Sequence, residues 1–212
     1  MARPFWEKAY ADLHTPTFGG PSQEVRDIAL EFRPGAKVLD LGCGEGRNAL
    51  FLAECGFDVT AVDISESGIR KLSALAQERN LDIHSEVVDM RDYQFPHSFD
   101  LITSHGCLHL VERASWQRLI SLFKAHTKPG GINIIVVFTD VIPPPGDLED
   151  FCLGLFHEGE LVSMYADWDI ILQRSYTFED EHPGSPRHTH PVNKLVARKP
   201  PNKADASDKT AS

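Results

Sequence analysis

The fold of this chain is indicated above all by one glycine-rich stretch, Val38-Leu39-Asp40-Leu41-Gly42-Cys43-Gly44-Glu45-Gly46-Arg47-Asn48-Ala49. Apolar residues and one acid lead directly into alternating glycines, and apolar residues at helical spacing follow. Glycine is needed where the backbone takes a positive φ angle or where a ligand must approach without meeting a Cβ atom. The stretch therefore predicts a buried strand, a tight turn and the start of a helix, which together place a ligand at the carboxyl end of a parallel sheet.

The spacing of the glycines narrows the class of ligand. A dinucleotide fingerprint has the pattern G-x-G-x-x-G, whereas Gly42, Gly44 and Gly46 follow G-x-G-x-G. Asp40 stands two residues before the first glycine, and a second acid, Asp63, ends the next strand-like run. A carboxylate there can accept hydrogen bonds from both hydroxyl groups of a ribose. The pattern favours a ligand with a ribose. Glycines that serve only packing, or an NAD-dependent oxidoreductase, are the alternatives.

Strand-like and helix-like segments alternate along the chain, which predicts an α/β fold with a parallel sheet. Strands are expected at residues 37–41, 57–62, 83–88, 99–103, 132–138, 168–178 and 190–198. Residues 139–155 break the pattern, because their prolines remove backbone donors. Since this segment leaves the carboxyl end of a strand, we expect it to line a ligand pocket, with Phe151, Leu155 and Phe156 as apolar walls.

Bulk properties limit the partners. With 212 residues, of which 42% are hydrophobic, the chain is long enough for one well-cored domain. Its net charge of −10 argues against a nucleic acid or an anionic membrane as partner. The four cysteines show no C-x-x-C pairing, and no apolar run approaches the length of a membrane span. We expect a cytoplasmic monomer or homodimer with reduced thiols.

Five motifs, taken in order, resemble those of the class I S-adenosylmethionine-dependent methyltransferases. They are Val38–Gly46, Asp63, Val88-Asp89-Met90, Phe99-Asp100-Leu101-Ile102 and Lys128-Pro129-Gly130-Gly131. The resemblance implies a Rossmann-like, doubly wound sheet of seven mostly parallel strands with helices on both faces, whose antiparallel last strand is inserted between the fifth and the sixth. It also implies S-adenosylmethionine as cofactor, with the binding residues Asp40, Gly42, Gly44, Gly46, Asn48, Asp63, Ile64, Asp89, Met90 and Ser104.

Within that class, further motifs resemble the tellurite-resistance (TehB-like) methyltransferases. The residues that carry this resemblance are Gly46-Arg47-Asn48, Phe156-His157-Glu158-Gly159-Glu160-Leu161, Tyr165-Ala166-Asp167-Trp168 and Leu195-Val196-Ala197-Arg198-Lys199. The resemblance implies methyl transfer to a small-molecule acceptor, namely a thiol or a metalloid oxyanion such as tellurite or selenite. A non-catalytic regulatory module that binds the cofactor is the alternative, because binding residues do not by themselves imply turnover.

Three residues are candidates for handling the acceptor. His105 follows the fourth predicted strand, at the switch point of a doubly wound sheet, and a neutral histidine can accept a proton from a thiol, hydroxyl or amine. The family resemblance points to His182, between the last two strands. Arg187 lies a few residues later and can bind an anionic acceptor through its fork of donors.

His182, His188 and His190 also lie close together in sequence. Three histidines can ligate zinc, and they can equally contact the acceptor or be solvated in a loop between strands. We assign no metal site from the sequence.

The chain divides into three parts. Residues 1–21 carry aromatic residues beside a Gly-Gly step, which suits a flap over the cofactor site or an arm packed on the surface. Residues 22–198 are expected to form the methyltransferase domain. Residues 199–212 are too polar to bury a core and are expected to be disordered.

Overall fold

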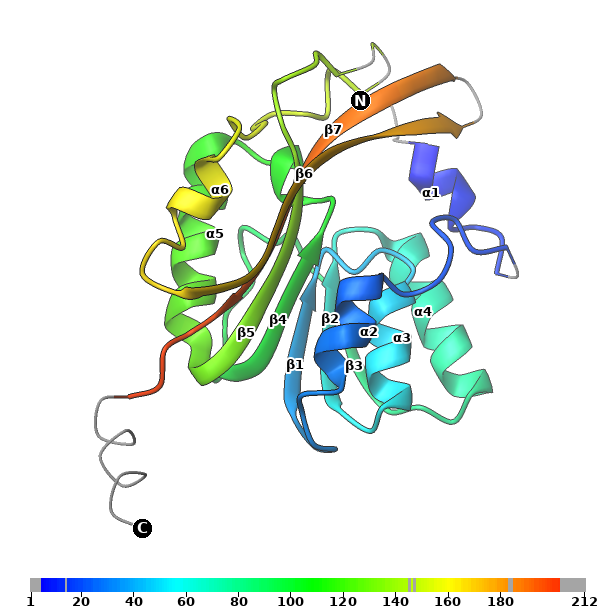
Figure 1. Cartoon of the computed structure of the whole chain (residues 1–212). Coiled ribbons are helices and arrows are strands. Elements are labelled where there is room, and N and C mark those ends of the chain that lie inside the picture. The colour runs from blue at the N-terminus through cyan, green and yellow to red at the C-terminus, as the bar shows by residue number, and fades with distance from the viewer. Residues whose placement is uncertain (1–4, 14, 145, 147, 183–184, 203–212) are drawn as a thin grey trace.

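The computed structural model describes residues 5–13, 15–144, 146, 148–182 and 185–202 (Figure 1). Most of the predicted C-terminal tail, residues 203–212, thus lies outside the described residues. The strands are β1 (Lys37–Leu41), β2 (Asp58–Asp63), β3 (Ile83–Val87), β4 (Phe99–His105), β5 (Thr127–Phe138), β6 (Asp169–His182) and β7 (Ser185–Arg198). The helices are α1 (Phe5–Ala9), α2 (Gln23–Ala29), α3 (Arg47–Glu54), α4 (Glu66–Glu78), α5 (Arg113–His126) and α6 (Glu160–Ser163), with the 3-10 helix η1 (Leu108–Leu110) after β4.

The strands form a seven-stranded sheet of order β3-β2-β1-β4-β5-β7-β6. Strands β1 to β5 pair in parallel, whereas β7 pairs antiparallel with both β5 and β6. The direction of winding reverses between β1 and β4, which is the switch point where doubly wound sheets bind ligands. The predicted Rossmann-like fold with an inserted antiparallel last strand is confirmed.

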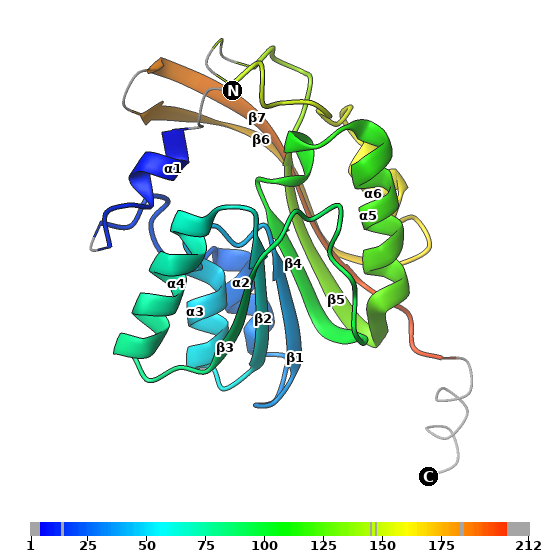
Figure 2. The same ribbon diagram turned by 180° about the vertical axis from the view of Figure 1, so that it is seen from behind.

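Helices cover both faces of the sheet, with α2, α3 and α4 on one face and α5 and α6 on the other (Figures 1 and 2). Successive side chains of a strand point to opposite faces. In β1, Val38 therefore packs with Leu52 of α3, while Leu39 belongs to the cluster that contains Phe123 of α5. Two apolar cores result, and both hold the carboxyl ends of the central strands in place.

No helix in the described ranges is both long and apolar enough to cross a membrane.

The hairpin of β6 and β7 is longer than the sequence predicts. Instead of ending at residue 178, the ladder continues through the pairs Asp180–His188 and His182–Ser185. The residues of β7 before Pro191 do not pair with β5, and with the end of β6 they extend past the sheet as a two-stranded ribbon (Figure 1). Residues 179–182 and 187–189 of the ribbon are all polar or charged, so they show no alternating apolar pattern by which a strand could be predicted. The predicted loop between these strands is therefore wrong.

Thr15 and Thr17 of the N-terminal segment are bound to the turn that follows β1 and to α4, through the two members of a buried ion pair. Lys71 of α4 lies 2.7 Å from Glu45 of the turn, and their side chains are 2% and 5% exposed. Glu45 accepts hydrogen bonds from the backbone N–H (2.6 Å) and the hydroxyl (2.8 Å) of Thr17. Lys71 donates to the carbonyl oxygen of Thr15 at 2.7 Å. Because both charges are paired and further hydrogen-bonded, the pair fixes this N-terminal segment to the domain.

Replacing Lys71 with methionine should lower the free energy of unfolding by about 3–5 kcal/mol, because the buried carboxylate of Glu45 loses its positive partner. Urea denaturation measures this change. The matched control is Lys37→Met, whose partner Asp58 is 56% exposed. That variant should lose at most about 1 kcal/mol. Equal losses in the two variants would contradict the anchoring role of the buried pair.

Candidate active site

The turn between β1 and α3 depends on two glycines with positive φ. The φ angle is +78° at Gly42 and +56° at Gly44. A Cβ atom at position 42 would lie 2.2 Å from the Sγ atom of Cys107, and one at position 44 would lie 2.5 Å from the hydroxyl oxygen of Tyr10. The bare backbone of the turn is thus in contact with the loop after β4 and with the segment after α1. No other residue type allows both approaches.

Asp63 ends β2 beside this turn. Its carboxylate accepts hydrogen bonds from the backbone N–H groups of Gly44 (2.7 Å) and Ser65 (2.8 Å). Burial raises the pKa of Asp63, and these N–H groups partly oppose the shift. The acid that the sequence predicts to bind a ribose therefore lies at the glycine turn and connects it to the start of α4.

Asp40 lies within β1 and is buried. Its Oδ2 atom has no hydrogen-bond partner among the described residues. Burial raises the pKa of Asp40 to about 7, and Arg47 lowers it and Asp63 raises it by smaller amounts. A buried carboxyl oxygen without a donor calls for an explanation, and a cationic ligand beside the turn would supply one.

Two apolar residues lie at the carboxyl ends of β2 and β3. These strands pair through Asp63 and Val87, so that the residues following each of them are neighbours. Ile64 is 64% exposed although it is apolar. The Cε atom of Met90 lies 3.7 Å from the position that a Cβ atom would take at Gly42. The side chain of Met90 therefore borders the glycine turn, and Ile64 directly follows Asp63 at the end of β2.

Three other residues that the sequence assigns to the cofactor are engaged within the chain. They are Asp89, whose carboxylate is paired with Arg91; Ser104, whose hydroxyl lies 3.0 Å from the Sγ atom of Cys107; and Asn48, which accepts a hydrogen bond from the backbone N–H of Ser22. The side-chain hydrogen bonds from Arg91 lower the pKa of Asp89. Ser104 and Asn48 are buried; the first contact joins β4 to the loop after it, and the second joins the start of α2 to α3.

His105 ends β4 and is buried against the start of α2. Its Nδ1 atom lies 3.3 Å from the hydroxyl of Ser22, and its Nε2 atom lies 3.3 Å from Oε1 of Glu24. Burial lowers the pKa of His105 to about 3, and the positive charges of Arg47 and Lys194 contribute to the shift. Lys194 also lies 2.6 Å from the Glu24 carboxylate and compensates its charge. The imidazole is therefore neutral at physiological pH and holds a proton only weakly.

The other two acceptor candidates lie on the β6–β7 ribbon. The side chain of Arg187 is 68% exposed and pairs with Glu179. The side chain of His182 lies outside the described residues. Lys194 shares a carboxylate partner with His105, and it stands seven positions after Arg187, which corresponds to about 23 Å along a strand. The structure thus does not bring His105 and Arg187 together.

Some residues at the site escaped the sequence analysis. Tyr10 is buried and covers Gly44. The available sign of this in the sequence was that residues 1–21 carry aromatic residues. Glu24 is buried beside His105, and its signal was an acid next to Val25 on the apolar face of α2. Phe156, which was expected to line a pocket, is instead buried in the core, where it stacks on Trp116 at 3.9 Å.

Comparison with known proteins identifies the family. A family model described as tellurite resistance protein TehB matches residues 4–181. The chain belongs to the TehB family. It is 35% identical over 150 residues to the probable S-adenosyl-L-methionine-dependent methyltransferase TehB of Haemophilus influenzae, with 70% of this chain and 51% of that protein covered. This TehB family member thus spans about half the length of that relative. The predicted family is confirmed.

Solved structures agree with this assignment. The crystal structure of TehB from Haemophilus influenzae has a TM-score of 0.76 and 30% identity, and the match covers 92% of this chain and 67% of that chain. The 1,6-didemethyltoxoflavin-N1-methyltransferase of Burkholderia thailandensis, solved with bound S-adenosylhomocysteine, has a TM-score of 0.62 and 24% identity over 84% of this chain and 77% of that one. The second likeness shows the fold alone.

Replacing Gly42 with alanine should destabilise the protein more than the same change at Gly106. Both glycines have positive φ, so both variants bear the backbone cost of about 1–2 kcal/mol. Only the Cβ atom at position 42 meets a neighbour, Cys107, whereas a Cβ atom at position 106 meets nothing within 4 Å. We expect an additional loss of about 1–3 kcal/mol at position 42, measured by urea denaturation. Equal losses would contradict the close packing of the turn.

Asp40→Asn should become more stable relative to the wild type as the pH rises. The pKa of Asp40 is raised to about 7 in the folded protein, above its ordinary value of 3.8, so the folded state binds more protons between these two pH values. The contribution of Asp40 to stability therefore falls as the pH rises from about 4 to about 7. Asparagine removes this penalty, which amounts to at most about 4 kcal/mol at pH 8. Unfolding curves at pH 5 and pH 8 measure it, and a pH-independent difference would contradict the raised pKa.

Proposed function

We propose that this TehB family member is an S-adenosylmethionine-dependent methyltransferase that acts on a small-molecule acceptor. The observation that carries the proposal is the glycine turn with its two acids, in a chain that belongs to the TehB family. Bare backbone at Gly42 and Gly44 lies beside the carboxyl groups of Asp40 and Asp63, at the switch point of the sheet. A curated relative bears the name of such a methyltransferase.

The side chains around the turn fit this cofactor. S-adenosylmethionine carries a sulfonium and an ammonium group, and the carboxyl group of Asp40 offers them an oxygen without a partner among the described residues. A carboxylate has about four acceptor positions, so Asp63 can still accept from ribose hydroxyls while it holds Gly44 and Ser65. We assign the two faces of the adenine to Ile64 and Met90.

The N-terminal segment supports the same proposal. Tyr10 covers Gly44, and Thr17 is anchored to Glu45 in the turn. We therefore propose that residues 1–21 form the flap over the bound cofactor. The net charge of −10 argues against a nucleic acid or an anionic membrane component as acceptor, and we propose a cytoplasmic monomer or homodimer.

The state of His105 bears on the choice of acceptor. When bound, S-adenosylmethionine supplies an electrophilic methyl group. With a pKa of about 3, His105 is a poor general base near pH 7, because a useful base has a pKa close to the working pH. We therefore favour an acceptor that needs no proton removed at this position, namely a thiolate or a metalloid oxyanion such as tellurite or selenite. Arg187 is exposed and can bind such an anion with its planar guanidinium group. We propose His182 as a second residue that handles the acceptor.

Asp63→Asn should weaken the binding of S-adenosylmethionine by about 10- to 100-fold, because it removes the charge from hydrogen bonds worth about 1.5–3 kcal/mol. Isothermal titration with S-adenosylmethionine and with NAD measures both affinities. The control is Asp58→Asn, at the opposite end of β2 and 56% exposed, which should bind the cofactor like the wild type.

The same preparations should then be assayed for methyl transfer to a thiol, to selenite and to tellurite. Transfer by the wild type and its loss in Asp63→Asn would support the enzyme. Cofactor binding without transfer to any of the three would favour the regulatory module instead. Binding of NAD in place of S-adenosylmethionine would overturn the proposal.

A further inference from the structure

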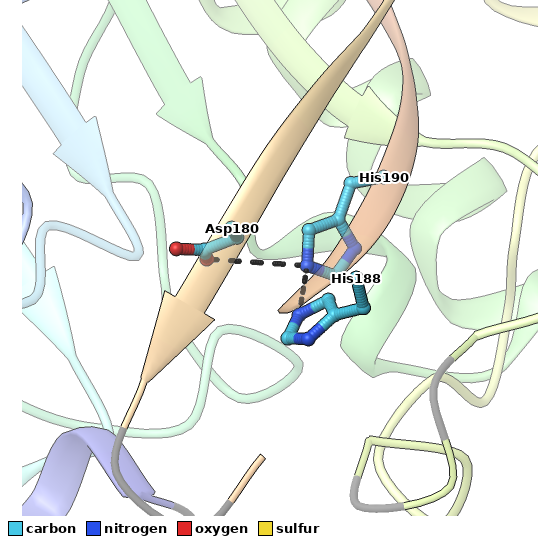
Figure 3. Close-up of side chains that lie close together, drawn as sticks. All are labelled: Asp180, His188 and His190. Atoms are coloured by element: carbon cyan, nitrogen blue, oxygen red, sulfur yellow. Dashed lines mark hydrogen bonds and ion pairs between the residues drawn. The ribbon is translucent and has the colours of Figure 1, made fainter. Parts of the chain in front are cut away.

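Three potential metal ligands meet on the β6–β7 ribbon: Asp180, His188 and His190 (Figure 3). The Nε2 atoms of the two histidines are 2.9 Å apart, and Oδ2 of Asp180 lies 4.0 Å from Nε2 of His190. One ligand atom from each residue lies within 4.8 Å of the other two. The three side chains thus present one oxygen and two nitrogens to a common point.

The register of the ribbon explains this convergence. Asp180 of β6 stands directly opposite His188 of β7, and directly opposed residues share a face of a sheet. His190 is two positions further along β7, so it lies on that face too. Arg187 and Glu179, which precede His188 and Asp180 in the sequence, pair with each other. The backbone pairing itself therefore brings the three ligands together.

Aromatic packing orients the deepest of the three. His190 is 3% exposed, and its ring stacks on Phe138 of β5 at 4.4 Å and lies against Phe178 of β6 at 5.2 Å. These contacts fix the plane of the imidazole and direct its Nε2 atom to His188 and Asp180. A ligand whose orientation is fixed in advance loses little freedom when an ion binds.

The distances suit an ion of a particular class. Ligands with bonds of about 2.0–2.2 Å stand about 3.0–3.5 Å apart in octahedral or tetrahedral geometry. The observed separations of 2.9 and 4.0 Å bracket that range, so a small rotation of the Asp180 carboxylate completes the site. Two imidazoles and one carboxylate favour first-row transition metals, whereas magnesium and calcium prefer all-oxygen sites.

We propose that Asp180, His188 and His190 form a binding site for a divalent first-row transition-metal ion such as Zn²⁺. Three protein ligands leave at least one coordination position for water or a small anion, as in sites that bind substrates. The site lies on the same face of β7 as Lys194, four residues or about 13 Å from it, and Lys194 reaches the carboxylate beside His105. The proposal stands independently of methyl transfer.

The competing explanation is a hydrogen-bonded group in which one imidazole donates to the other. Zinc binding separates the two explanations, and it is measured on the full chain after treatment with a chelator, by competition with a chromophoric chelator. We expect one Zn²⁺ per chain. Asp180→Asn, which preserves the shape of the side chain, and His188→Ala should each weaken binding at least about 10-fold. The control His157→Ala changes a histidine whose side chain is exposed and pairs with Asp140, away from the three proposed ligands, and it should bind zinc like the wild type.

A second readout guards against variants that merely fold poorly. Zinc should raise the midpoint of thermal unfolding of the wild type and of His157→Ala, and it should leave Asp180→Asn and His188→Ala unchanged, because only an ion bound to the folded state stabilises it. No zinc binding by the wild type would overturn the proposal. Equal affinity and equal thermal shifts in all four proteins would overturn it as well, since the ion would then be bound elsewhere, for example by a cysteine.

Discussion

The arrangement of the site depends on the absence of side chains at positions 42 and 44. Cys107 and Tyr10 occupy the space that Cβ atoms would need, and Asp63 accepts a hydrogen bond from the exposed N–H group of Gly44. Through these contacts the turn draws together the loop after β4, the segment after α1 and the end of β2. The backbone of these two glycines, which have no side chains, thus positions segments that are far apart in sequence.

The buried carboxyl groups fall into two classes, those paired with a lysine and Asp40, which is not. Glu45 is paired with Lys71, and Glu24 is paired with Lys194, so that each of these carboxylates has a cation close by. Among the described residues, Asp40 forms no ion pair; burial raises its pKa to about 7, and Arg47 and a backbone hydrogen bond from Ala49 oppose this rise only in part. Paired charges connect elements of the fold, whereas an ionisable group with a strongly shifted pKa beside the glycine turn is typical of a functional site.

Much of the fold could be predicted because its signals are local. Val38 and Leu39 belong to an apolar strand, and the glycines after them admit few conformations, so the order of strands and helices followed from the sequence. The ribbon could not be predicted in the same way. Residues 179–182 and 187–189 are polar or charged, and the pairing of Asp180 with His188 depends on register rather than on hydrophobic pattern.

Some features of the candidate site could likewise be predicted from the sequence and others could not. Asp63 could be placed at the turn because the end of a parallel strand fixes its position. The neutral state of His105 could not, because it results from burial against Ser22 and Glu24 of a helix that is distant in sequence. The ion pair between Asp89 and Arg91 could not be predicted either, because it depends on side-chain rotamers, which a sequence pattern does not specify.

The position of β7 has a consequence for how the protein is made. β5 is apolar and buried along most of its length, and it pairs with β4 on one side and with β7 on the other. Translation reaches β7 only after the proline-rich segment, α6 and β6, so the second edge of β5 stays open throughout that interval. An open apolar edge can pair with the wrong strand, including one from another nascent chain. The space between β5 and β6 in the sheet is therefore filled by a strand that is synthesised after both of its neighbours.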